Sequence, residues 1–149
     1  MKLLVLNGPN LNLLGFREPD WYGRETLEDL EKHLQEAFPQ VVFTFFQSNH
    51  EGELIDQLHE AHTRQLSGVI FNPGGFTHTS IALRDAIAAI TPPVVEVHIS
   101  NIYARESFRQ HSVLAPACVG QISGLGLDGY YLAVMFFLRR QGNRGYVED

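Results

Sequence analysis

The chain has 149 residues, of which 44% are hydrophobic and 19% charged, and its formal net charge is −6 at pH 7. This length suits one domain, and the composition excludes an intrinsically disordered protein. The negative charge and the scattered Lys and Arg residues argue against a nucleic-acid partner. The one cysteine, Cys118, cannot form an intrachain disulfide, and we expect it to be a small buried residue.

The chain begins with a short apolar run, residues 3–6, which ends at Asn7-Gly8-Pro9. This run is too short for a signal peptide or a membrane span, so we predict a buried strand in a cytoplasmic protein without a membrane partner. A helix is expected from Thr26, which has the spacing of a capping box with Asp29. The apolar residues 27, 30, 34 and 38 then share one face of that helix.

The same alternation of strand and helix continues along the chain. The further predicted strands are residues 41–46, 69–71, 94–97 and 117–122. A helix capped by Ser48 and Glu51 follows the second strand, and residues 81–90 form another that stops before Pro92-Pro93. The last helix, about 127–140, is apolar nearly all round, which predicts burial either in the core or at a subunit interface. The tail after about Gln141 is expected to be disordered.

Five such units account for the whole length as a single domain, residues 1–149. Nearly continuous apolar strands that alternate with helices indicate an α/β fold with a parallel sheet covered on both faces. We predict a flavodoxin-like, doubly wound sheet of five strands in the order 2-1-3-4-5. Ligands of such sheets bind outside the carboxyl ends of the strands, so a site is expected there.

Polar residues follow three of the predicted strands. The three segments are Asn7-Gly8-Pro9-Asn10, Asn72-Pro73-Gly74-Gly75 and His98-Ile99-Ser100-Asn101. Their neutral hydrogen-bonding groups suit a polar, oxygen-rich ligand. Turn formation alone also favours Asn, Gly and Pro at any one of these places, but it explains all three together less well.

Glu96 and His98 are two residues apart, so they lie on the same face of the fourth strand. A carboxylate in an apolar strand needs a partner, and the nearest candidate is the imidazole of His98. A carboxylate that holds a histidine in one tautomer is typical of acid–base catalysis. The alternative is a purely structural Glu–His pair.

A glycine-bounded loop, residues 14–23, follows the first strand and can act as a lid over the site. Arg17 and Tyr22 are its reactive residue types, although such residues in a loop are most often surface residues. Further along the chain, His78, Asp85 and Arg109 add polar groups. Arg105 lies one helical turn before Arg109, so the two could present a cationic face to a carboxylate.

Four other classes of site do not fit. The G-x-G-x-x-G pattern at residues 124–129 comes too late for a βαβ unit, so we interpret it as a tight turn with close helix packing. The segment His59-Glu60-Ala61-His62 lacks zincin spacing. Asn7 and Asn72 stand at two strand ends where a phosphoacceptor domain would need acidic residues. The only lysines, Lys2 and Lys32, are badly placed for a Schiff base. A site without metal or cofactor remains.

These ordered motifs, from the first strand to the final helix, resemble the type II 3-dehydroquinate dehydratases. The residues that carry the resemblance are Asn7-Gly8-Pro9-Asn10-Leu11, Arg17 with Tyr22-Gly23, Asn72-Pro73-Gly74-Gly75, Thr77-His78-Thr79-Ser80 and Glu96-Val97-His98-Ile99-Ser100-Asn101. The resemblance implies conversion of 3-dehydroquinate to 3-dehydroshikimate, in the shikimate pathway of aromatic amino-acid biosynthesis, by anti elimination through an enolate and with no cofactor.

The resemblance also implies five catalytic roles. Tyr22 would remove the proton at C2, and Arg17 would favour its phenolate form. Asn10 would help hold a water that stabilises the enolate oxygen. His98 would protonate the departing C1 hydroxyl, with Glu96 orienting it.

The remaining implied roles concern binding and assembly. Asn72 and the backbone at Ile99 and Ser100 would hold the substrate carboxylate, and Gly74 would also bind substrate. His78 and Arg109 would bind ring hydroxyls. Asp85 would reach a neighbouring subunit's site in a homododecamer, a tetramer of trimers. The rival hypothesis is a non-catalytic flavodoxin-like module that binds a small sugar acid or a flavin.

Overall fold

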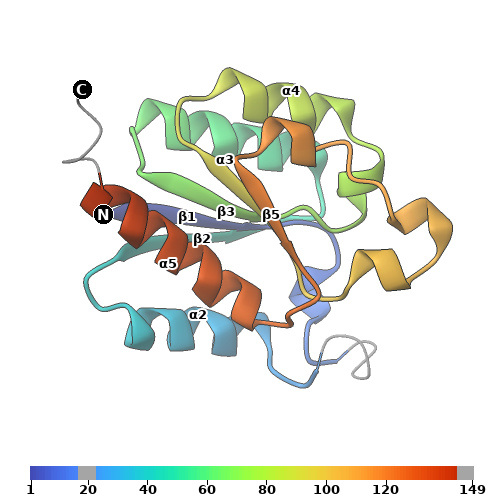
Figure 1. Cartoon of the computed structure of the whole chain (residues 1–149), viewed down its shortest axis with the longest axis horizontal. Coiled ribbons are helices and arrows are strands. Elements are labelled where there is room, and N and C mark those ends of the chain that lie inside the picture. The colour runs from blue at the N-terminus through green and yellow to red at the C-terminus, as the bar shows by residue number, and fades with distance from the viewer. Residues whose placement is uncertain (17–22, 144–149) are drawn as a thin grey trace.

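The structure is a computed structural model, and it describes residues 1–16 and 23–143. Its centre is one parallel sheet (Figure 1), with five strands in the order β2-β1-β3-β4-β5. The strands are β1 (Lys2–Asn7), β2 (Val42–Gln47), β3 (Gly68–Asn72), β4 (Val94–His98) and β5 (Gly120–Ser123). The predicted flavodoxin-like order is therefore confirmed.

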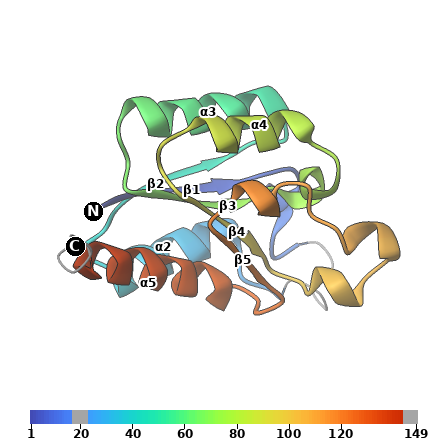
Figure 2. The ribbon, with the colours of Figure 1, turned by 45° about the horizontal axis from the view of Figure 1, so that its top comes forward.

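Helices cover both faces of this sheet. Figure 2 shows α3 (Glu51–Thr63) and α4 (Ile81–Ala89) on one face, and α2 (Leu27–Ala37) and α5 (Asp128–Asn143) on the other. The strand β1 lies between two cores: Leu3 belongs to the cluster under α2 and α5, and Leu4 to the cluster under α3 and α4. Because both faces are covered, β1 reads as a continuous apolar run.

The helix α2 begins as predicted. The Asp29 backbone N–H donates to Thr26 Oγ1 over 3.1 Å, and the Thr26 N–H donates to Asp29 Oδ2 over 3.0 Å. These two bonds form a reciprocal capping box, which satisfies backbone donors that a helix start otherwise leaves open.

The predicted cap of α3 is wrong. Ser48 accepts from the His50 backbone and donates to Glu53 over 2.5 Å, while Glu51 accepts from Ser80 Oγ over 2.6 Å. Glu51 therefore bonds to the start of α4 and does not form a capping box with Ser48. The tertiary partner outcompetes the local one because Ser80 lies at the neighbouring helix start.

The helix α5 is only partly buried in the single chain. Tyr130 and Phe137 pack under the sheet, whereas Leu132, Met135 and Phe136 are 42%, 49% and 40% exposed. The expected burial in the core is confirmed for the side of the helix that carries Tyr130 and Phe137. Burial of the exposed apolar stripe, formed by Leu132, Met135 and Phe136, at a subunit interface stays a prediction. The helix continues to Asn143, two residues past the expected start of the tail, and residues 144–149 lie outside the described part.

The turn before α5 explains the G-x-G-x-x-G pattern. Gly124 and Gly126 have φ values of 89° and 61°, a left-handed conformation that favours glycine. A Cβ at Gly129 would lie 3.1 Å from Val97 Cγ1, so glycine permits close packing of α5 on β4. The interpretation as a tight turn with close helix packing is confirmed.

Cys118 is half-buried, less than the sequence led us to expect. Its burial, with the nearby Glu96 charge, raises the pKa of the thiol to about 12, which makes it a poor nucleophile. It comes just before β5, which begins later than predicted because Ala115–Ala117 form a 3-10 turn containing a proline. Across residues 1–16 and 23–143, we find no helix with the length and apolar character needed to span a membrane.

Candidate active site

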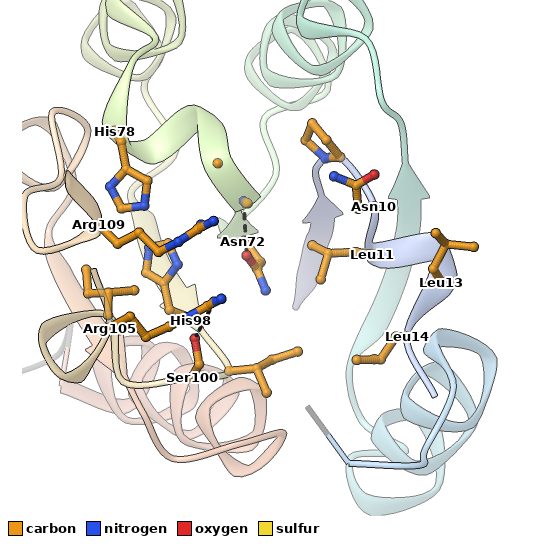
Figure 3. Close-up of a pocket in the computed structure, with 15 residues that line it drawn as sticks. Asn10, Leu11, Leu13, Leu14, Asn72, His78, His98, Ser100, Arg105 and Arg109 are labelled. Atoms are coloured by element: carbon orange, nitrogen blue, oxygen red, sulfur yellow. Dashed lines mark hydrogen bonds between the residues drawn. The ribbon is translucent and has the colours of Figure 1, made fainter. Parts of the chain in front are cut away.

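A cavity of about 190 Å³ opens at the carboxyl ends of β1, β3 and β4. Figure 3 shows His78, Arg109, Arg105 and Ser100 on one side and Asn10 with Leu11, Leu13 and Leu14 on the other. Eight of the twelve predicted site residues line it: Asn10, Asn72, Gly74, His78, His98, Ile99, Ser100 and Arg109. The expectation that these three strand ends meet at one site is therefore correct.

The other four predicted residues are placed differently. Glu96 is fully buried behind His98. Asp85 lies exposed on α4 and does not line this cavity. Arg17 and Tyr22 fall outside the described residues.

The carboxylate of Glu96 receives four side-chain hydrogen bonds. Three reach Oε2, from His98 Nε2 at 2.5 Å, Gln121 Nε2 at 2.6 Å and Thr77 Oγ1 at 2.8 Å. The fourth reaches Oε1, from Ser112 Oγ at 2.8 Å. All four partners can donate, so they suit an ionised acceptor.

These bonds decide the ionisation state of Glu96. Burial alone would raise its pKa, but the hydrogen bonds from His98, Gln121 and Thr77 and the interaction with the imidazole outweigh burial and lower it. Since Glu96 can only accept, His98 must donate from Nε2, which assigns the tautomer of the ring. Within the described residues Nδ1 has no protein partner, so it is the nitrogen that a ligand in the cavity can reach.

Asn72 lies between the two sides of the cavity (Figure 3). Its Oδ1 accepts from the Gly74 backbone N–H over 3.2 Å, and its Nδ2 donates to Tyr130 Oη over 3.0 Å. Gly74 has a φ of 59°, a conformation that a side chain would strain. The Asn72-Pro73-Gly74 segment is therefore shaped to hold the amide of Asn72 in place.

Asn10 is held by its backbone. Its φ is 69°, a left-handed conformation that Asn tolerates better than most residues, and its N–H donates to Asn49 Oδ1 over 3.0 Å. Gln47 Nε2 in turn donates to Asn49 Oδ1 over 3.2 Å. These bonds tie the segment after β1 to the end of β2.

His78 offers the cavity a hydrogen-bond acceptor. Its Nδ1 lies 2.9 Å from the His111 carbonyl oxygen and must donate to it, which leaves Nε2 with a lone pair. Burial lowers the pKa of His78, and the positive charge of Arg109 acts in the same direction, so the neutral ring is favoured.

The two arginines do not lie on one helical turn as expected. Arg105 follows the 3-10 helix Ile102–Ala104, and Arg109 ends a second one, Ser107–Arg109. Both line the cavity nevertheless. Arg105 Nη1 donates to Ser100 Oγ over 3.5 Å, and Arg109 Nε donates to Glu106 over 2.9 Å. Glu106 pairs with both guanidinium groups, at 3.8 Å from Arg105 and 2.9 Å from Arg109, so two positive charges share one carboxylate and the balance still favours an anionic ligand.

Some residues of the site could not be selected from the sequence. Ser112 and Gln121 surround Glu96, but no local pattern marks them; the only signal is that a buried carboxylate needs donors. Thr77 belongs to the Thr77-His78-Thr79-Ser80 motif, in which only His78 had a predicted role. Apolar and backbone groups also line the cavity, at Pro9, Leu11, Leu13, Leu14, Gly75 and Ile102. In residues 1–16 and 23–143, no group of three or more His, Cys, Asp or Glu residues could hold a metal ion.

Solved structures resemble the whole fold. The type II dehydroquinase from Butyrivibrio crossotus DSM 2876 has a TM-score of 0.90 and 46% sequence identity, covering 93% of this chain and 97% of that one. The type II dehydroquinase from Propionibacterium acnes has a TM-score of 0.89 and 41% identity, covering 93% and 96%.

Sequence relatives carry the same assignment. The 3-dehydroquinate dehydratase of Bacillus pumilus is 62% identical over 141 residues, covering 93% of this chain and 95% of the relative. That of Bacillus subtilis is 57% identical over 142 residues, with the same coverage. The sequence model of the class II dehydroquinases matches residues 1–138. This chain therefore belongs to the class II dehydroquinase family.

Proposed function

We propose that this class II dehydroquinase is a 3-dehydroquinate dehydratase, a hydro-lyase of the shikimate pathway. The reaction removes the C2 proton and the C1 hydroxyl of 3-dehydroquinate on opposite faces, by way of an enolate, and yields 3-dehydroshikimate and water. The observation that carries the proposal is the His98–Glu96 pair at the cavity wall, with Nδ1 of His98 available to a ligand.

His98 acts as the general acid. A hydroxyl is a poor leaving group, so the imidazole enters this step protonated on both nitrogens and delivers the Nδ1 proton as the C1–O bond breaks. The hydroxyl departs as water, and the ring is left neutral with its proton on Nε2, donated to Glu96. Glu96 fixes the ring through Nε2 and stabilises the protonated imidazole, since it keeps its negative charge although it is fully buried. Its remaining hydrogen bonds keep that carboxylate from turning away.

The base is Tyr22, with Arg17 favouring its phenolate form. Both roles follow from the family resemblance, because these residues lie outside the described part of the chain. Asn10 completes the catalytic set by holding a water against the enolate oxygen. Its fixed backbone places it across the cavity from the histidine side (Figure 3).

The other lining residues bind substrate. Asn72, with the backbone at Ile99 and Ser100, holds the carboxylate, and Gly74 lines the cavity beside Asn72 and fixes its amide. This role is supported by the positive charge of the neighbouring Arg105 and Arg109. It is also supported by the Asn72 amide, because its oxygen already accepts from Gly74 and its NH₂ group is the part that can donate to a carboxylate.

His78 and Arg109 bind the hydroxyls of the substrate ring. The neutral ring of His78 presents an acceptor at Nε2, and the guanidinium of Arg109 presents donors. A polyhydroxylated ring needs both, because each hydroxyl can donate one hydrogen bond and accept two.

We also propose that the whole chain is one catalytic domain that assembles in the cytoplasm as a dodecamer, a tetramer of trimers, in which Asp85 completes a neighbouring subunit's site. Support comes from the exposed apolar stripe of α5 at Leu132, Met135 and Phe136, and from the exposed position of Asp85. The bacterial biosynthetic relatives suit a cytoplasmic enzyme.

The non-catalytic binding module is not favoured, because the family and the relatives are enzymes. Purified protein mixed with 3-dehydroquinate should produce a rise in ultraviolet absorbance as the conjugated enone forms. A protein that carries a flavin colour and leaves 3-dehydroquinate unchanged would contradict the proposal.

A further inference from the structure

Three polar side chains, Asn7, Tyr130 and Asn72, are linked by hydrogen bonds behind the cavity, and the proposed mechanism uses only Asn72. Tyr130 projects from α5, is 0% exposed, and lies between the ends of β1 and β3. Its Oη donates to Asn7 Oδ1 over 2.6 Å and accepts from Asn72 Nδ2 over 3.0 Å. These hydrogen bonds thus connect α5 to a residue that lines the cavity.

The direction of these hydrogen bonds is fixed by donor counting. Burial raises the pKa of Tyr130, so the phenol keeps its single proton. If both asparagine amides were turned over, Asn7 would donate to Tyr130, and the phenol would donate to Asn72 Oδ1. The Nδ2 group of Asn72 would then face the Gly74 backbone N–H, donor against donor, at 3.2 Å. Gly74 therefore excludes this reversed arrangement.

This direction determines what Asn72 offers a ligand. One N–H of its Nδ2 is taken by Tyr130, and Oδ1 is taken on one side by Gly74. The second N–H of Nδ2 has no partner in the described residues, while Asn72 lines the cavity. A fixed N–H donor beside two arginines suits a carboxylate oxygen.

We propose that Tyr130 is a positioning residue that orients the Asn72 amide, so that a fixed N–H meets the carboxylate of the substrate. The proposal rests on the proposed function for the identity of that carboxylate. Tyr130 touches no substrate itself, since it is fully buried. Because a carboxylate stays the same from ground state to transition state, the contribution of Tyr130 should appear in KM and not in kcat.

The test is Tyr130→Phe, which removes one oxygen and keeps the ring. We expect KM for 3-dehydroquinate to rise by about 10-fold, the usual worth of a hydrogen bond to a charged group, with kcat unchanged. Tyr131→Phe is the matched control, because Tyr131 is the next residue of the same helix and is only partly buried. It should change neither constant.

A double-mutant cycle separates positioning from a general loss of packing. In the Asn72→Ala background, Tyr130→Phe should leave KM unchanged, because the amide that it orients is gone. An equal rise in KM in both backgrounds, or an unchanged KM in Tyr130→Phe itself, would overturn the proposal. Turnover by the unsubstituted protein is measured alongside, so a failure of the proposed function is recognised separately.

A second variant covers the case in which Tyr130→Phe does not fold. Asn7→Leu removes the acceptor of the phenol, which frees the Tyr130 proton to turn toward Asn72 Nδ2 and push that amide out of place. The same rise in KM at unchanged kcat is expected. An Asn7→Leu protein that is folded and keeps the original KM would refute the positioning role.

Discussion

Replacing Glu96 by Gln keeps the size of the side chain but removes the charge from a fully buried carboxylate. Three of its four hydrogen bonds converge on Oε2, so the amide oxygen should take that position. The new NH₂ group then meets Ser112 Oγ, which already accepts the backbone N–H groups of Leu114 and Ala115 at 3.2 Å and 3.0 Å. Its two lone pairs are used, so a buried donor is left without a partner.

The cost in stability can be worked from these contacts. Each of the three bonds that lose their charged acceptor should weaken by about 1 kcal/mol, and the unpartnered NH₂ group should cost about 1–3 kcal/mol. Relief from burying a charge offsets part of this. We expect the free energy of unfolding to fall by about 3 kcal/mol, and kcat to fall because His98 loses the anion that stabilises its protonated form.

Urea denaturation followed by circular dichroism measures the stability change, and enone absorbance measures kcat. Because the pKa of Glu96 is lowered from its ordinary 4.5, its carboxylate stabilises the fold above that pH, and this stabilisation is lost as the pH falls through the lower folded value. The difference between wild type and variant should therefore shrink on acidification. Glu60→Gln, on the exposed face of α3, is the control. Equal stability and equal kcat in Glu96→Gln would refute the reasoning.

The remaining predictions test the other proposed roles. His98→Ala should fold and bind substrate but lose about 10²–10⁴-fold in kcat; an unchanged kcat would make His98 only a structural partner of Glu96. Tyr22→Phe should abolish turnover while keeping binding. Arg17→Gln should lower kcat and move the acidic limb of the pH–rate profile upward, because an unassisted phenol ionises later; a change in KM alone would make Arg17 a binding residue. Asp85→Ala should lower activity without dissociating the assembly, and a fully active monomer by light scattering would argue against Asp85 acting between subunits.

The sequence predicted the fold closely because its strands are buried on both faces. Residues 3–6 and 94–97 are mostly apolar, and their short length together with the flanking Asn, Gly and Pro residues distinguishes them from the helices. The start of one strand was predicted wrongly: β5 begins at Gly120 and not at residue 117, because a proline-containing turn precedes it. The cap at Ser48 failed because Glu51 found a partner, Ser80, 29 residues away.

The same limit applies to the site. Asn10, Asn72 and His98 could be chosen from the sequence because parallel strands end at a common edge. Gln121 and Tyr130 could not, since their roles depend on contacts 25 and 58 residues away along the chain. Local patterns carry no information about such pairs. The spacing of Arg105 and Arg109 suggested a helix, yet two short 3-10 turns bring both to the cavity.

The most direct test of the central claim is turnover of fresh 3-dehydroquinate by protein that has been treated with a chelator, incubated with borohydride together with substrate, and then desalted, because borohydride itself reduces the ketone of the substrate. Enolate chemistry by side chains alone predicts the same rate of enone formation as in untreated protein, because neither a metal nor an imine takes part. Loss of activity on borohydride treatment, with a covalent adduct on Lys2 or Lys32, would contradict the account.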